Sequence, residues 1–436
     1  MVKTLEQRVL SRLNWRIVPL VMLMYFISYI DRVNIGFAAL TMNKQLGYSN
    51  EVFGFGAAIF FIGYFLFETP SNLIMHKVGA RIWIARIMIT WGVLSAGMAL
   101  VKSPMSFYVL RFMLGVAEAG LFPGVIYYLS LWFPKRRRAA ATAWFTAAVP
   151  ISTILGSPIS GALVGLPTML GLAGWQWMFI VEAAPAVILG VVVLFIMTDR
   201  PEQAKWLKDD ERSWLVDTMA EENAEKAGVA VHSPWKALID PRVLLLGVIY
   251  FGTSTGLYVI SLWSPLMIKE FGLSPLNIGL VNAVPAMFGL VVMIVWAWNS
   301  DRTGERAWHA ALACLLAAAG LFYGAAFGTT LPAVLIALTI ATIGVSCSKP
   351  PLWSMPTLFL SGPAAAGGIA LMNAIGNLGG FVGPYMIGWI KGVTGSFSGG
   401  LYFVGGTLVF SAVLILITER ARVKSAARLL AQSAAA

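Results

Sequence analysis

The chain has 436 residues, of which 58% are apolar and only 12% are charged, and its mean hydropathy is +0.78. No water-soluble domain of this length hides so much apolar surface, so the composition excludes an ordinary soluble protein. The net charge of +11 is spread over many loops rather than gathered in a patch, which argues against a nucleic-acid partner.

Twelve apolar stretches have the length of about 20 residues that a helix needs to cross the hydrocarbon core of a membrane. The first is too long and too charged at its middle for a cleavable signal peptide. The sequence therefore predicts an all-α integral membrane protein with twelve transmembrane helices. In chain order the predicted spans are 16–36, 52–73, 82–101, 106–131, 139–165, 175–197, 241–267, 277–298, 308–328, 331–359, 365–390 and 400–418.

Lysine and arginine indicate which side of the membrane each loop faces, because cytoplasmic loops carry the excess of both. With the N-terminus inside, 24 of the 31 basic residues fall in cytoplasmic segments, four fall outside and three lie within spans. We therefore expect both termini to lie in the cytoplasm.

One long polar stretch, residues 198–240, separates six predicted spans from six others. It predicts a cytoplasmic linker between an N-terminal half, 1–197, and a C-terminal half, 241–436, that ends in a short cytoplasmic tail. Two such halves, related by a pseudo-twofold axis along the membrane normal, place a substrate site near the bilayer midplane. We expect the linker to be a solvated hinge or surface helix, and a regulatory partner site is the alternative.

Five charged residues lie inside the predicted spans: Asp31, Arg32, Arg111, Glu118 and Lys349. A charge at the bilayer centre costs about 2.5–3.5 kcal/mol even on lenient insertion scales, so such residues usually serve ion or substrate pathways. Their presence predicts a carrier for a charged solute.

Arg111 and Glu118 are seven residues apart on one predicted helix, so they face the same side, about 10 Å apart along its axis. Each therefore needs a partner from another helix, and Asp31 and Arg32 are available. Burial favours a neutral carboxyl group whereas a nearby arginine favours the charged form, which poises these acids between two states. We interpret Asp31 and Glu118 as proton-coupling residues, and the two arginines as groups that alternate between them and a substrate carboxylate. A static network of buried salt bridges is the alternative.

Signatures of enzyme and cofactor chemistry are missing from the sequence. The two cysteines lie in apolar spans, the three histidines lie near loops without forming a cluster, and no nucleophile–base pair or phosphate-binding loop occurs. We therefore expect no enzyme activity, no metal and no cofactor. A solute or ion gradient is then the only possible energy source for transport, or transport is not energised at all.

Short motifs are spaced along nearly the whole chain. They are Tyr29-Ile30-Asp31-Arg32, Glu68-Thr69-Pro70-Ser71-Asn72-Leu73, Val78-Gly79-Ala80-Arg81, Arg111 with Glu118-Ala119-Gly120, Gly174-Trp175-Gln176-Trp177-Met178-Phe179, Ser300-Asp301-Arg302 with Gly304 and Arg306, and Gly376-Asn377-Leu378-Gly379-Gly380. Together they resemble the major facilitator superfamily, and more narrowly its anion:cation symporter branch. That branch includes bacterial tartrate, phthalate and galactonate permeases and animal sialin-type carriers. In the galactonate-type carriers the matching acids and arginines are implicated in proton coupling and substrate binding.

The resemblance also implies further substrate-binding residues. Tyr29, Tyr64, Trp353 and Asn373 fall where galactonate-type carriers place hydroxyl-binding or ring-stacking groups. Asn377 lies one turn beyond Asn373 on the same helix face. The alternative for Asn373 is a hydrogen bond between helices, and the alternative for the tryptophan and the tyrosines is packing in the core or at the lipid interface.

Lys349 precedes Pro350-Pro351, which remove two amide donors and disfavour a helical conformation at the preceding residue. We therefore expect the tenth span to be broken there. A third basic group beside a broken helix suggests a second anionic group on the substrate, and a lysine that snorkels to the interface is the alternative.

Loop charges beside helix ends are expected to act as gates, because they gain from the helix dipoles in one conformation only. The predicted gating residues are Arg81, Asp301 and Arg302. The first half departs from the superfamily, since His76-Lys77 stands where an Asp-Arg pair is usual. Two other acids, placed nearer the membrane faces, are expected to be structural caps or gate partners: Glu68 and Glu182.

The sequence thus predicts a secondary active transporter that imports a small organic anion with protons by alternating access. The expected cargo is a carboxylate such as tartrate, phthalate or a sugar acid, and an organic anion exchanger on the same fold is the alternative. No Asn-x-Ser/Thr site occurs, unlike in the glycosylated animal relatives, which favours a bacterial inner membrane. We expect the carrier to work as a monomer in the lipid bilayer.

Overall fold

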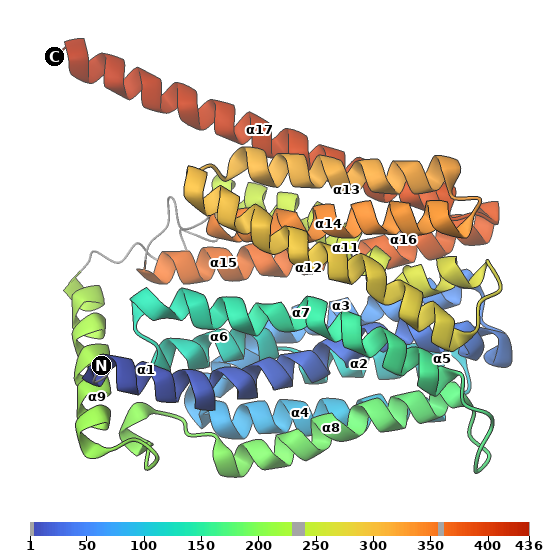
Figure 1. Cartoon of the computed structure of the whole chain (residues 1–436), viewed down its shortest axis with the longest axis horizontal. Coiled ribbons are helices and arrows are strands. Elements are labelled where there is room, and N and C mark those ends of the chain that lie inside the picture. Colours follow the sequence, from blue (N-terminus) through green and yellow to red (C-terminus); the bar gives the residue numbers. More distant parts are fainter. Residues whose placement is uncertain (1–3, 229–239, 356–361, 436) are drawn as a thin grey trace. The chain divides into compact units, whose positions relative to one another are not determined.

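The computed structural model describes residues 4–228, 240–355 and 362–435, and most of them are helical (Figure 1). Within these residues eleven helical segments are long and apolar enough to cross a membrane. Each predicted span coincides with one helix or with two consecutive helices, which confirms the all-α membrane fold. Residues 356–359, the end of the tenth predicted span, lie outside the described residues.

The N-terminal part of the chain supplies the first six predicted spans. Its helices are α1 (Leu5–Arg16), α2 (Val18–Leu46), α3 (Asn50–Val78), α4 (Ala80–Gly97), α5 (Pro104–Glu118), α6 (Leu121–Trp132), α7 (Lys135–Val164), α8 (Gly174–Ile196) and α9 (Asp209–Gly228). The fourth predicted span is divided between α5 and α6, so that Glu118 stands at a helix end within that span rather than within a continuous helix.

The C-terminal part supplies the other six. Its helices are α11 (Pro241–Lys269), α12 (Pro275–Thr303), α13 (Ala307–Phe327), α14 (Leu331–Ser354), α15 (Gly362–Asn377), α16 (Gly379–Thr394) and α17 (Ser398–Ala435). The eleventh predicted span, 365–390, is made by α15 and α16, which meet at Leu378.

Two compact units can be distinguished by how the helices pack. Within the described residues, one unit comprises 4–48, 59–228 and 274–280, and the other comprises 49–58, 240–273, 281–355 and 362–435. The first turns of α3 pack on α16, where a Cβ on Gly54 would lie 2.9 Å from the Pro384 carbonyl oxygen. The first turns of α12 pack on α7 in the same way, since a Cβ on Gly279 would lie 2.3 Å from the Ser157 carbonyl oxygen. The predicted division of the chain into the halves 1–197 and 241–436 stays a prediction.

Part of the predicted linker is helical. Residues 209–228 form α9, which crosses the end of α1 (Figure 1). Arg8 lies 3.2 Å from Asp210, and Arg12 lies 2.9 Å from the buried Glu211. Residues 229–239 lie outside the described residues, so the linker as a whole stays a prediction.

Candidate functional site

A buried ion pair joins α2 to the end of α5. Arg32 Nη2 lies 2.5 Å from Glu118 Oε1, and the same oxygen accepts a hydrogen bond from Ser28 Oγ at 2.7 Å. Arg32 is 6% exposed and Glu118 is 1% exposed. A buried charge that keeps its partner is tolerated, whereas removing one partner costs about 3–5 kcal/mol. Arg32 and Glu118 can therefore separate only if each charged group gains a new partner or loses its charge.

The position of Glu118 depends on a local break in the helix. Ala119 adopts a non-helical conformation, and Gly120 follows with φ 94°, a value that favours glycine. A Cβ on Gly120 would also lie 2.4 Å from Ser71 Oγ of α3, so a larger residue has no room there. The Glu-Ala-Gly motif of the sequence thus ends α5 where the carboxylate meets Arg32.

Close packing of α3 on α5 places Arg111. A Cβ on Gly115 would lie 2.0 Å from the Phe60 carbonyl oxygen, and one on Gly63 would lie 2.4 Å from the Phe112 carbonyl oxygen. Only glycine permits backbones to approach so closely. Arg111, one turn before Gly115, is consequently 1% exposed and lies against α3.

One aromatic ring, Phe60, lies beside both arginines of the site. Its centroid is 4.9 Å from Arg111 Cζ and 5.6 Å from Arg32 Cζ, and Arg32 also lies 5.1 Å from the Tyr64 ring. Such cation–π contacts contribute about 2 kcal/mol or more when they are desolvated. Sequence reasoning selected Tyr64 and missed Phe60, although Phe60 lies one turn earlier on the same helix.

Asp31 has neutral partners, which differs from the expected pairing of both acids with arginines. Its Oδ2 accepts from Trp91 Nε1 at 2.6 Å, and its Oδ1 accepts from Ser95 Oγ at 3.0 Å and from Asn34 Nδ2 at 3.2 Å. In the described part of the chain no basic side chain lies within ion-pair distance of Asp31. Consecutive residues of a helix are turned by about 100°, so Asp31 and Arg32 meet different neighbouring helices.

Glu182, which was expected nearer a membrane face, is enclosed by neutral side chains inside the first unit. It lies about 12 Å into α8, at eight residues past the helix start. The side chain is 6% exposed, accepts from Ser160 Oγ at 2.6 Å, and accepts from Asn34 Nδ2 at 3.0 Å. The apolar stretch alone does not show which polar neighbours enclose a side chain. Glu68, the other acid of that group, is also buried.

The remaining predicted substrate residues lie in two places. Tyr29 is buried in the first unit, with its ring centroid 6.3 Å from that of Tyr25. In the second unit, the Trp353 ring lies 5.0 Å from Tyr250 in an edge-on arrangement. Asn373 and Asn377 of α15 are both buried, and Lys349 of α14 is half-buried.

The expected break of the tenth span at Lys349 is wrong. α14 continues through Pro350 and Pro351 as far as Ser354. Prolines have no amide hydrogen, so the carbonyl groups of the residues four positions earlier, 346 and 347, receive no helix bond from them. The helix is therefore continuous, but it leaves two backbone acceptors without their usual donors.

The predicted gating residues make local contacts. The Arg81 amide, at the start of α4, donates to Asp199 Oδ1 at 2.8 Å, and the Arg81 side chain lies 3.7 Å from the same carboxylate. Sequence reasoning missed Asp199, which follows the sixth span. At the other loop, Asp301 lies 2.5 Å from Arg306, and Arg302 lies against the ring of Trp298 at 5.4 Å.

Glu305, in the loop before α13, gives a testable pH dependence. Partial burial opposes its ionisation, but hydrogen bonds from the Trp308 amide and from the amide and ring of His309 outweigh it and lower the pKa of this carboxyl group. A lowered pKa stabilises the fold above the ordinary value of 4.5, and this stabilisation is lost as the pH falls through the lower value of the folded protein. We expect Glu305→Gln to lower the melting temperature at neutral pH, and the difference from wild type to shrink on acidification. The exposed Glu202→Gln is the control, and a difference independent of pH would contradict the assignment.

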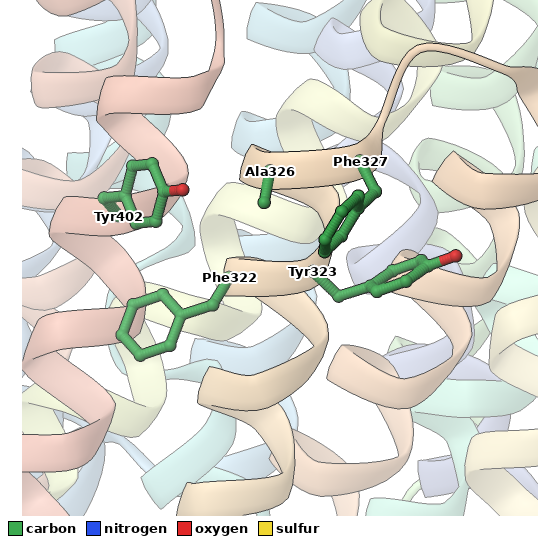
Figure 2. Close-up of a pocket in the computed structure, with 5 residues that line it drawn as sticks. All are labelled: Phe322, Tyr323, Ala326, Phe327 and Tyr402. Atoms are coloured by element: carbon green, nitrogen blue, oxygen red, sulfur yellow. The ribbon is translucent and has the colours of Figure 1, made fainter.

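A shallow hollow in the second unit is separate from these charges. It has a volume of about 460 Å³ and is lined by apolar and aromatic side chains of α13 and α17 (Figure 2). The lining residues are Phe322, Tyr323, Ala326, Phe327 and Tyr402. It is lined by none of the predicted site residues, so it does not support an anion site.

Comparison with known proteins finds transporters by family profile, by sequence and by fold. The family profile described as Major Facilitator Superfamily matches residues 21–384. A candidate tartrate transporter of Agrobacterium vitis is 66% identical over 423 residues, which cover 97% of this chain and 93% of the relative. The quinolone resistance transporter of Acinetobacter baumannii is 38% identical over 413 residues, covering 94% and 95%. The solved structure of a D-xylose–proton symporter has a TM-score of 0.72 at 15% identity, covering 92% of this chain and 97% of that one, a likeness of fold alone.

Proposed function

Because the chain belongs to the major facilitator superfamily, we propose that it imports a small organic anion together with protons by alternating access. It is a multi-pass membrane protein, and it resembles bacterial transporters over almost its full length. The observation that supports proton coupling is the buried ion pair between Arg32 and Glu118. The proposed setting is a bacterial inner membrane, with both termini in the cytoplasm and a single chain as the working unit.

The proposed coupling is an exchange of partners at Arg32. Protonation of Glu118 removes the charge that holds the guanidinium group. Arg32 then binds the substrate carboxylate, because its planar fork matches two carboxylate oxygens with parallel hydrogen bonds. Arg111, which contacts the same Phe60 ring as Arg32, supplies a second positive charge. The anion replaces the charge that the proton cancelled, so the two solutes enter together.

The cargo that we propose is a hydroxylated dicarboxylate such as tartrate, ahead of phthalate and sugar acids. The relative from Agrobacterium vitis, a candidate tartrate transporter, supports this choice. Lys349 offers a positive charge for a second carboxylate, and Trp353, Asn373 and Asn377 offer a ring and two amides in the same unit. Tyr29 and Tyr64 are the hydroxyl-bearing groups proposed for the first unit.

The proposed gates are the loop charges at the helix ends. Arg81 with Asp199, and Asp301 with Arg306, are ion pairs that can form in one conformation and separate in the other. Arg302 is proposed to assist the second pair.

Uptake by the reconstituted carrier tests the proposed function. Purified protein in liposomes is given labelled tartrate with an inward proton gradient, without a gradient, or with unlabelled anion trapped inside. Concentrative uptake that requires the gradient and no internal anion supports symport. Uptake that ignores the gradient and requires internal anion would replace symport by anion exchange.

Lys349→Ala tests the charge of the cargo. We expect the KM for dicarboxylates to rise about tenfold or more, because a charge-assisted contact contributes about 1.5–3 kcal/mol. The KM for monocarboxylates should stay unchanged. Lys102→Ala, at an exposed lysine, is the control. Equal effects on both substrate classes would return Lys349 to a snorkelling or packing role.

A further inference from the structure

Two buried carboxyl groups from different helices share one amide. Asn34 Nδ2 lies 3.2 Å from Asp31 Oδ1 and 3.0 Å from Glu182 Oε2. The three side chains are 0%, 1% and 6% exposed, in the order Asn34, Asp31 and Glu182. The two carboxyl oxygens are thus held within about 6 Å of each other by a neutral bridge, away from water.

The side chains that surround this pair supply neutral donors only. Trp91 and Ser95 of α4 donate to Asp31, and Ser160 of α7 donates to Glu182. Among the described residues, neither carboxyl group has a basic side chain within ion-pair distance.

The charged groups that act on the pair from further away belong to α2 and α5. They are Arg111 and the Arg32–Glu118 ion pair, in which the charge of Arg32 is already matched by Glu118. Two ionised carboxylates at this separation repel each other strongly in a low dielectric, so one of them keeps a proton.

Asn34 also has an acceptor that the present arrangement does not use. Its Oδ1 atom is buried and has no hydrogen-bond partner in the described residues. A buried polar atom without a partner costs about 1–3 kcal/mol, which calls for a second state that satisfies it. Rotation of the amide would turn Oδ1 toward the carboxyl groups, where it can accept the O–H of a protonated acid. The Asn34 amide can therefore donate from Nδ2 to an ionised carboxylate and, after rotation, accept at Oδ1 from a protonated carboxyl group.

We propose that Asp31 and Glu182 share a proton across Asn34, which makes Glu182 a further proton-binding residue of the carrier. The role in transport rests on the proposed function. At neutral pH, repulsion by the Glu182 carboxylate keeps the coupling proton bound to Asp31. The proton moves between carboxyl oxygens and solvent, and no other bond changes.

Infrared titration of the purified carrier in lipid tests this proposal without any substrate. Wild type should show a protonated-carboxyl C=O band at neutral pH that disappears at alkaline pH. The absence of the band in wild type would overturn the proposal, and this measurement needs no variant. Because it involves no transport, its outcome is independent of whether the protein imports an anion with protons.

Matched variants assign the band. Glu182→Gln keeps the shape and the hydrogen bonds of the side chain but removes its proton site, so the band should lose intensity. Glu182→Asp and Ser160→Ala should retain it. Glu211→Gln is the control, since Glu211 is also buried but is paired with Arg12 at 2.9 Å and should contribute no band. An unchanged band in Glu182→Gln would show that Glu182 neither binds the proton nor influences the carboxyl group that does.

The pH dependence of uptake provides the functional readout. We expect Glu182→Gln to shift the half-maximal proton concentration about tenfold toward acid, because the like charge that held the proton is gone. A carrier that loses the infrared band but keeps its pH profile would contradict the role in transport.

Discussion

Glu118→Gln is expected to reduce uphill uptake of the anion at least tenfold while exchange of labelled for unlabelled anion continues. Glutamine keeps the volume of the side chain and can still accept from Ser28 Oγ, which lies 2.7 Å from the carboxylate in wild type. It cannot bind or release a proton, and it cannot match the charge of Arg32. The proton gradient then has no group to act on at this position, whereas substrate can still exchange across the membrane.

The control for Glu118→Gln is Glu211→Gln. Both glutamates are 1% exposed and both are paired with arginine, but Glu211 belongs to α9 and contacts Arg12. Removing a buried partner can destabilise either protein by about 3–5 kcal/mol, so uptake is compared per folded molecule after measuring the melting temperature. Wild-type accumulation by Glu118→Gln would rule out this acid as the coupling group.

Gly115→Ala is expected to reduce transport at least tenfold and to lower the melting temperature of the purified carrier. The added Cβ would lie 2.0 Å from the Phe60 carbonyl oxygen, and backbone atoms cannot move aside as a side chain can. The helices α3 and α5 must separate, which lifts Arg111 away from the Phe60 ring. Overpacking of this kind typically costs about 1–3 kcal/mol and sometimes more.

Gly97→Ala is the matched control for Gly115→Ala. It makes the same chemical change in the same unit, but its Cβ would meet only Leu110 Cδ2 at 3.9 Å, an ordinary contact. We expect its uptake and melting temperature to match wild type. If the two variants behave alike, the close approach of α3 and α5 does not position the arginines.

The sequence alone was sufficient to predict features that depend on whether a segment lies in water or in lipid. Apolar length predicts the spans, and the helices coincide with them. The intramembrane charges at Arg32 and Glu118 stood out for the same reason, because a charge in an apolar stretch is costly. These inferences need only the chemistry of each segment.

Features that depend on a neighbouring helix could not be predicted. Glu182 sits in an apolar stretch like the others, but its neutral partners Asn34 and Ser160 come from two different helices. Phe60 is one of 25 phenylalanines, and nothing local distinguishes it from a core residue. The helix break expected at Lys349 is a different kind of miss, since α14 continues through two prolines that disfavour an isolated helix.

The ring of Phe60, within 6 Å of two guanidinium groups, has a consequence for how the proposed anion site can evolve. The ring attracts both cations through its quadrupole and carries no formal charge. Replacement of Phe60 by another aromatic residue with a more or less electron-rich ring would change the affinity for the anion without altering the proton stoichiometry. Divergence of cargo preference among related carriers can therefore proceed at an aromatic position while every ionisable residue stays in place.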